Sequence, residues 1–175
     1  NMEPINNYGL DPSFTSMHIS HHLLTELLVK ENPSLRVVAT SSGTHHFCAW
    51  TSMLPKALRL YPAGCIDDDY LATGIHSPVN AYKYITSKVA NVMHTTEIPR
   101  RHPSSTAIGI DLGWVGTSIV SFMTGNISPT SVGWMRSASI GIYPILQAIL
   151  QPLAYFDEGR DWSKEGGLLI DPLGN

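Results

Sequence analysis

Apolar and polar positions along the chain follow two different periods, one typical of helices and one typical of strands. Residues 18–30 carry apolar side chains at helical spacing, namely Ile19, Leu23, Leu24, Leu27 and Leu28. Asn32-Pro33 ends this predicted helix, because the residue before a proline is biased away from the helical region. A compact apolar strand is predicted over residues 35–39, and the polar run Thr40-Ser41-Ser42-Gly43 ends it.

The remainder of the chain continues this alternation. A second helix is predicted from about Pro78 to Arg101, with an inner face formed by Val89, Val92 and Met93. Three further strands are predicted: one ending at Ile5, one over residues 106–112 and one over residues 168–170. Strands that alternate with helices are typical of an α/β layer architecture with a parallel sheet.

Two stretches do not fit simple strands or helices. Residues 43–80 form an irregular insert rich in Gly, Pro and Asp, longer than an ordinary connecting loop. Residues 137–156 contain no charged side chain, and the segment reaches the length of a membrane span. Two prolines and two glutamines weaken that segment as an inserted helix, so we expect a substrate-covering or interfacial element, broken near Pro144.

Composition narrows the function classes. The chain has 175 residues, a formal net charge of −3, and only 14% charged residues. Because a typical domain has about 25% charged residues, much of this chain is expected to face protein or lipid, which allows peripheral membrane association. No run of three Lys or Arg residues occurs, which argues against nucleic-acid binding. Cys48 and Cys65 form no disulfide framework, and no signal peptide is visible. We therefore expect an intracellular protein, with a membrane-associated or organellar compartment left open.

The first candidate for chemistry is a tyrosine–lysine pair on the second predicted helix. Tyr84 and Lys88 are four residues apart and therefore share one helix face. A neighbouring ammonium stabilises the phenolate and lowers the pKa of a phenol from about 10. Ser42 and residues 111–118 each follow a predicted parallel strand, and the carboxyl ends of such strands form the edge where α/β sheets bind ligands. The spacing alone is a weak motif, but the combination predicts a site at this edge.

In these residues the chain resembles the short-chain dehydrogenase/reductase family. The matching segments follow the family order: Asn6-Asn7-Tyr8-Gly9, Val37 to Ser42, Tyr84-Ile85-Thr86-Ser87-Lys88, Gly113 to Thr117, and the tail from Gly167 to Asp171. The amino-acid sequences of these segments are most similar to those of members that act on retinoids, sterols and other lipid carbonyls. The resemblance covers nearly the whole chain. It implies strands four to seven of an incomplete Rossmann-like, doubly wound parallel sheet.

The resemblance also implies a reaction and a set of roles. Tyr84 would be the general acid/base, Lys88 would hold the nicotinamide ribose, and Ser42 would bind the substrate carbonyl. The implied cofactor is NADP or NAD, contacted by Asn7, Gly9, Lys88, Val115 and Thr117. Residues 119–156 would form an apolar substrate-covering lobe. The implied function is an oxidoreductase that interconverts a hydrophobic alcohol and a ketone or aldehyde.

Three departures from the family pattern leave the enzymatic assignment open. No GxxxGxG phosphate loop occurs, so the chain is expected to be a single partial domain over residues 1–175 that lacks the adenosine half. Met17 stands where the family carries a catalytic asparagine, and Leu112 stands where it carries a proline. A partner protein, or further chain, would have to cover the exposed edge of the first strand. The alternative function is therefore a catalytically inactive structural subunit of a larger complex.

Histidines suggest a metal site, which the sequence argument disfavours. His18, His21 and His22 are spaced along one helix, and His45 and His46 follow the next strand. Such a set could bind zinc. We expect no metal, because no carboxylate accompanies these histidines at tight spacing and the resembled family uses no metal there. Surface and loop histidines are the expected alternative. The acidic run at residues 67–69 is likewise expected to be solvated.

Overall fold

A three-stranded parallel sheet organises the computed structural model, which describes residues 11–46, 80–118, 135–156, 159, 161–165 and 167–170. Its strands are β1 (Arg36–Thr40), β2 (Thr106–Ile110) and β3 (Leu168–Ile170), in the order β1-β2-β3. Val38 is paired with Ile108, which is paired with Leu168. The predicted strands are confirmed to within one or two residues at each end. The predicted strand at Ile5, most of the insert at 43–80, and residues 119–134 lie outside the described residues.

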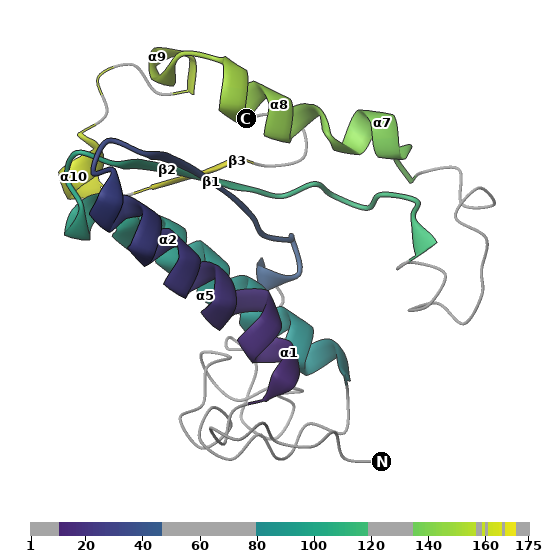
Figure 1. Ribbon diagram of the computed structural model, residues 1–175. Helices are drawn as coiled ribbons and strands as arrows, with labels where there is room; N and C mark the ends of the chain where they lie inside the picture. The colour runs from purple at the N-terminus through teal and green to yellow at the C-terminus, as the bar shows by residue number, and fades with distance from the viewer. Residues whose placement is uncertain are drawn as a thin grey trace, which may run out of the picture.

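The first helical segment lies against one face of the sheet (Figure 1). It consists of α1 (Pro12–Phe14), the π-helix η1 (Thr15–Ile19) and α2 (Ser20–Glu31), which continue one another. Asp11 begins it, because its side chain accepts a hydrogen bond of 2.9 Å from the Phe14 N–H. The segment thus starts several residues before the predicted helix. The four leucines of α2 are exposed, and Val29 is its one buried residue.

The long helix α5 (Asn80–Arg101) lies on the same face, and its predicted extent is confirmed. Its predicted inner face was wrong, because Met93 is 55% exposed. The buried face instead combines polar with apolar residues. Its buried hydroxyl and amide side chains are those of Thr86, Ser87, Asn91 and Thr95, and its buried apolar side chains include Ile85, Ala90 and Ile98. This face approaches Gly109 of β2 so closely that an added Cβ would lie 3.4 Å from the Thr95 methyl group. Short side chains fit this close approach, and the Thr95 hydroxyl is satisfied by the Asn91 carbonyl at 2.8 Å.

The opposite face of the sheet is covered by α7 (Ala138–Gly141), α8 (Tyr143–Leu150) and α9 (Leu153–Phe156), as Figure 1 shows. The predicted break is confirmed: α8 begins at Tyr143 with Pro144 in its first turn, where the missing N–H costs nothing. The main core lies on this face and consists of Ile108, Ile110, Ala148 and Ile170. Among the described helices, none is long and apolar enough to cross a membrane.

An arginine fastens α8 to the edge strand. The Arg36 guanidinium of β1 donates to the carbonyl oxygens of Ala148, Ile149 and Gln151, at 3.2, 3.3 and 2.7 Å. These carbonyls at the C-terminal end of a helix lack partners within it, and a cation there also complements the helix dipole. The interaction therefore both caps α8 and holds it over β1.

The two crossover connections run on opposite faces of the sheet. The chain passes from β1 to β2 through α5, and from β2 to β3 through α7–α9 and the short helix α10 (Trp162–Glu165), which contacts α5. Both connections step across the sheet in the same direction. Because their helices lie on opposite faces, the two crossover connections have opposite handedness. One of them therefore departs from the right-handed connection that is usual between parallel strands. The described architecture is an open parallel α/β sheet covered on both faces.

The core on the α8 face should set the stability of the sheet. We expect Ile108→Ala to lower the free energy of unfolding by about 2–5 kcal/mol, because it leaves a cavity at a fully buried position. Ile140→Ala is the matched control. That side chain is 56% exposed, so its loss should change stability by less than about 0.5 kcal/mol. Urea denaturation of both variants measures the difference, and equal losses would contradict this assignment of the core.

Candidate functional site

The carboxyl ends of β1 and β2 meet closely at one edge of the sheet. A Cβ atom added to Gly43 would lie only 2.6 Å from Oδ2 of Asp111, so a larger residue there would have to displace the Asp111 carboxylate. Asp111 is buried, and its Oδ1 accepts a hydrogen bond of 2.9 Å from the Gly113 N–H. The loops that follow the two strands are thereby held against each other, at the edge where parallel sheets place ligands.

The predicted tyrosine–lysine pair lies beside this edge. The Lys88 Nζ atom is 5.4 Å from the centre of the Tyr84 ring and donates to the Thr40 carbonyl at 3.4 Å. The Ser41 hydroxyl in turn donates to the Lys88 carbonyl at 3.0 Å. Burial lowers the pKa of Lys88 from its ordinary value. The structure thus brings Tyr84 and Lys88 together and anchors Lys88 to the end of β1.

Ser42 immediately follows this anchored segment. Its hydroxyl accepts a hydrogen bond of 3.3 Å from the Thr44 N–H. Its carbonyl oxygen, rather than its hydroxyl, contacts Nδ1 of His45 at 2.6 Å. Burial lowers the pKa of His45, so the ring is neutral near pH 7. Among the described residues no histidine base is recorded on the Ser42 hydroxyl, so these contacts do not form the arrangement of a serine nucleophile.

The predicted cofactor residues after β2 are held by a different segment. Val115 forms a parallel bridge with Arg136, and the Gly116 N–H donates to the Arg136 carbonyl at 2.9 Å. Gly141 of α7 approaches Val115 so closely that a Cβ there would overlap its side chain. Val115 and Thr117 thus belong to a loop tied to the start of the helical cover. Asn7 and Gly9 lie outside the described residues.

Asn91 is a buried residue of this region that the sequence argument missed. Its Nδ2 donates to the carbonyls of Met17 at 3.3 Å and Thr40 at 3.5 Å, and its Oδ1 contacts Nδ1 of His18 at 2.9 Å. The signal was present in the spacing, because residues 84, 88 and 91 recur on one helix face. Asn91 connects α5, the π-helix η1 and the end of β1. The residue that the π-helix centres on is Met17.

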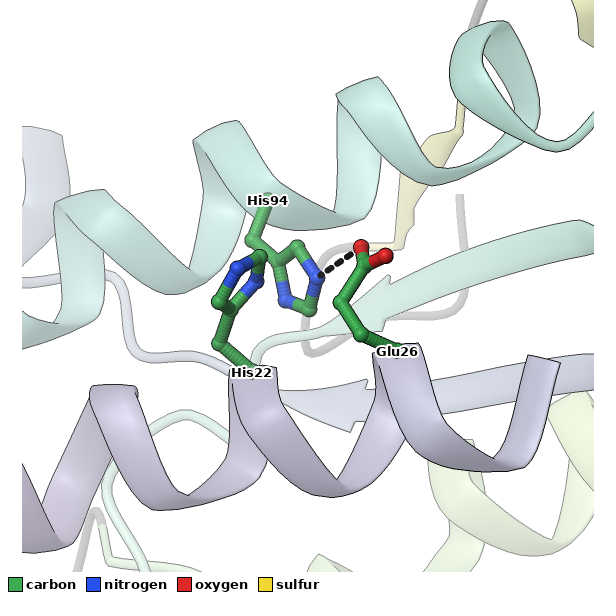
Figure 2. A group of neighbouring side chains, drawn as sticks. All are labelled: His22, Glu26 and His94. Atoms are coloured by element: carbon green, nitrogen blue, oxygen red, sulfur yellow. Dashed lines mark ion pairs between the residues drawn. The ribbon is translucent and has the colours of Figure 1, made fainter. Parts of the chain in front are cut away.

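A second polar cluster, also missed, lies between α2 and α5 (Figure 2). It joins His22, Glu26 and His94, whose ligand atoms all lie within 4.8 Å of one another. The expectation that no carboxylate accompanies the histidines was wrong, because Glu26 follows His22 by one helical turn. The predicted histidine set does not gather as one group: the rings of His45 and His46 contact each other in a tilted arrangement, 3.9 Å between centres, near the end of β1.

Comparisons with known proteins add no relative. No protein-family model, curated protein or solved structure matches the chain. Its function is therefore argued from the residues and contacts described above.

Two lysines should titrate in opposite directions from the ordinary value of 10.5. We expect the pKa of Lys88 below it, because of burial, and that of the exposed Lys164 above it, because of its hydrogen bond with Asp161. Folded Lys88 then binds fewer protons than the unfolded chain, so it makes the free energy of unfolding rise with pH until about 10.5.

NMR titration of the lysine CεH₂ groups measures both values in one sample, and Lys88→Met assigns the shifted signal. A Lys88 pKa at or above that of Lys164 would contradict the burial of this ammonium group.

Proposed function

We propose that the chain is an NAD(P)-dependent oxidoreductase that interconverts a hydrophobic alcohol and its ketone or aldehyde at the carboxyl edge of the sheet. The observation that carries the proposal is the placement of Lys88. Its ammonium group lies 5.4 Å from the Tyr84 ring and 3.4 Å from the carbonyl that ends β1, one peptide before Ser41-Ser42. A cation, a phenol and a hydroxyl at one sheet edge suit proton transfer to and from a substrate oxygen.

The residues at this edge would fit a nicotinamide cofactor. Lys88 would donate to a ribose hydroxyl, and Val115 and Thr117 lie on the loop after β2, where the carboxamide would be contacted. When bound, the nicotinamide ring supplies or accepts the hydride at the substrate carbon. The residues named here would contact only the nicotinamide half of the cofactor.

Three side chains would divide the proton chemistry. Tyr84 would give a proton to the carbonyl oxygen as the alcohol forms, and would take it back in oxidation. The Lys88 ammonium, 5.4 Å from the centre of the Tyr84 ring, would stabilise negative charge on the phenol oxygen as its proton leaves. The Ser42 hydroxyl would donate a hydrogen bond to the same substrate oxygen and so orient the carbonyl.

The helical cover supports a hydrophobic substrate. Six large apolar side chains on α7, α8 and the residue between them are 41–75% exposed: Ile140, Ile142, Tyr143, Leu146, Ile149 and Leu150. Exposed apolar side chains that gather into a large patch are typical of binding surfaces. These six follow the Val115 loop along the chain, which supports a role in binding a hydrophobic substrate or in a peripheral contact with lipid.

The second candidate function is a non-catalytic subunit of a larger assembly. The observation that favours it is the Met17 region, where the family pattern has a catalytic asparagine. The Met17 side chain carries no hydrogen-bonding group for that role, and its carbonyl is engaged by Asn91 at 3.3 Å. The exposed leucines of α2, between 50% and 57% accessible, add apolar surface that an assembly would bury.

One assay separates the two candidates. Reduced nicotinamide mononucleotide, which has no adenosine part, should reduce a long-chain aldehyde or a sterol ketone in the presence of the chain. We expect Tyr84→Phe to lower this rate by about 100-fold or more, because the phenolic proton is lost. The loss of nicotinamide absorbance is the measurement.

Ser20→Ala is the control, because it removes a hydroxyl that is exposed on α2, outside the apolar surface of α7 and α8, and it should leave the rate unchanged. Turnover that survives in the Tyr84 variant would contradict the proposed acid/base. Absence of turnover by the unaltered chain with every carbonyl tested would reject the enzymatic proposal and favour the structural one.

A further inference from the structure

We propose that His22, Glu26 and His94 bind a divalent transition-metal ion, with the donor set that zinc prefers, between α2 and α5. Figure 2 shows the three side chains pointing toward one another, two from α2 and one from α5. Their ligand atoms lie within 4.8 Å of one another. Two imidazole nitrogens and one carboxylate oxygen are a common three-residue zinc set that leaves one coordination position open.

The spacing of the three residues suits one small ion. His22 and Glu26 are one helical turn apart and share the α2 face toward α5. The rings of His22 and His94 are 4.3 Å apart between centres, and Nε2 of His94 is 3.9 Å from Oε1 of Glu26. Ligand atoms at about 2.0–2.1 Å from a tetrahedral ion lie about 3.3 Å apart. Small side-chain rotations would therefore close the site.

An unsatisfied atom points to the same place. Nε2 of His94 is buried and has no hydrogen-bond partner in the described part of the chain. The distance of 3.9 Å to Glu26 exceeds that of a hydrogen bond. A buried imidazole nitrogen that no hydrogen bond satisfies, next to a carboxylate, is a group that a metal ion could engage.

The surroundings orient the proposed ligands. Nε2 of His102 donates to the other carboxylate oxygen of Glu26 at 3.1 Å, which fixes the carboxylate. On the other side, the His18 ring stacks on His22 at 6.0 Å and is itself held by Asn91. Metal-ligating groups commonly have such outer partners. A groove of about 540 Å³, lined in part by Glu26, Lys30, Arg101 and His102, gives access to the carboxylate side. It lies away from Tyr84 and Lys88, so this site is separate from the proposed oxidoreductase centre.

The test is a zinc titration of the tag-free chain, first stripped of metal with a chelator. In competition with a chromophoric zinc indicator, we expect one equivalent of Zn²⁺ to bind. His22→Ala and His94→Gln should each weaken binding by more than about 100-fold, and His102→Gln by about 10- to 100-fold. His21→Ala is the matched control, because His21 is exposed on the same helix outside the set, and it should leave affinity unchanged.

A second measurement does not depend on the variants folding. Substitution of Co²⁺ for Zn²⁺ in the unaltered chain should give the visible spectrum of a nitrogen and oxygen site, without the intense charge-transfer bands of thiolate ligands. Bound Zn²⁺ should also protect His22 and His94, but not His21, from diethyl pyrocarbonate in mass-spectrometric mapping. Absence of stoichiometric binding, a thiolate spectrum from Cys48 or Cys65, or equal weakening by the His21 variant would each overturn the proposal.

Discussion

The hydrogen bonds of the buried Asn91 amide are the interactions on which both candidate sites depend, the Tyr84–Lys88 edge and the histidine cluster. A buried amide must have its hydrogen-bonding groups satisfied, and those of Asn91 reach the carbonyls of Met17 and Thr40 and the ring of His18. Through Thr40 it holds the end of β1, where Lys88 also donates, and so positions the tyrosine–lysine pair. Through His18 it holds the first helical segment against α5. The same Asn91 side chain therefore contacts the end of β1 through Thr40 and the surroundings of the histidine cluster through His18.

The close approach of α5 to the sheet explains why this polar network can exist. Gly109 on β2 lets α5 approach the sheet, with the Thr95 methyl group 3.4 Å from where a Cβ atom would lie, and the buried face of α5 includes threonine, serine and asparagine. The Thr95 hydroxyl bonds back to the Asn91 carbonyl of the helix and so is buried without loss of hydrogen bonding. The opposite face of the sheet is occupied by the apolar core around Ile108 and Ala148. Polar chemistry and hydrophobic stabilisation are thus divided between the two faces of one small sheet.

Much of the fold followed from local patterns. The strands at 36–40, 106–110 and 168–170, the extent of α5 and the break before Pro144 were all predictable, because each depends on periodicity or on a proline within a few residues. The inner face of α5 was predicted wrongly, because Met93 is exposed and polar residues such as Thr95 and Asn91 are buried with their hydrogen bonds satisfied. The tyrosine–lysine pair was predictable for the same local reason, since it lies within one helical turn.

The sequence by itself determined the order of elements, the shared helix face of Tyr84 and Lys88, and the position of Ser42 after a strand. These properties depend on neighbours along the chain. Only the tertiary structure decided that Asn91 bridges to Met17 and Thr40, and that His94 meets His22 and Glu26. Those contacts join residues more than 45 positions apart, and their distances depend on how closely two helices and a strand can pack. The lack of a side chain at Gly109 and the hydrogen bonds of buried polar groups contribute to that packing. Neither can be read from the periodicity of the sequence.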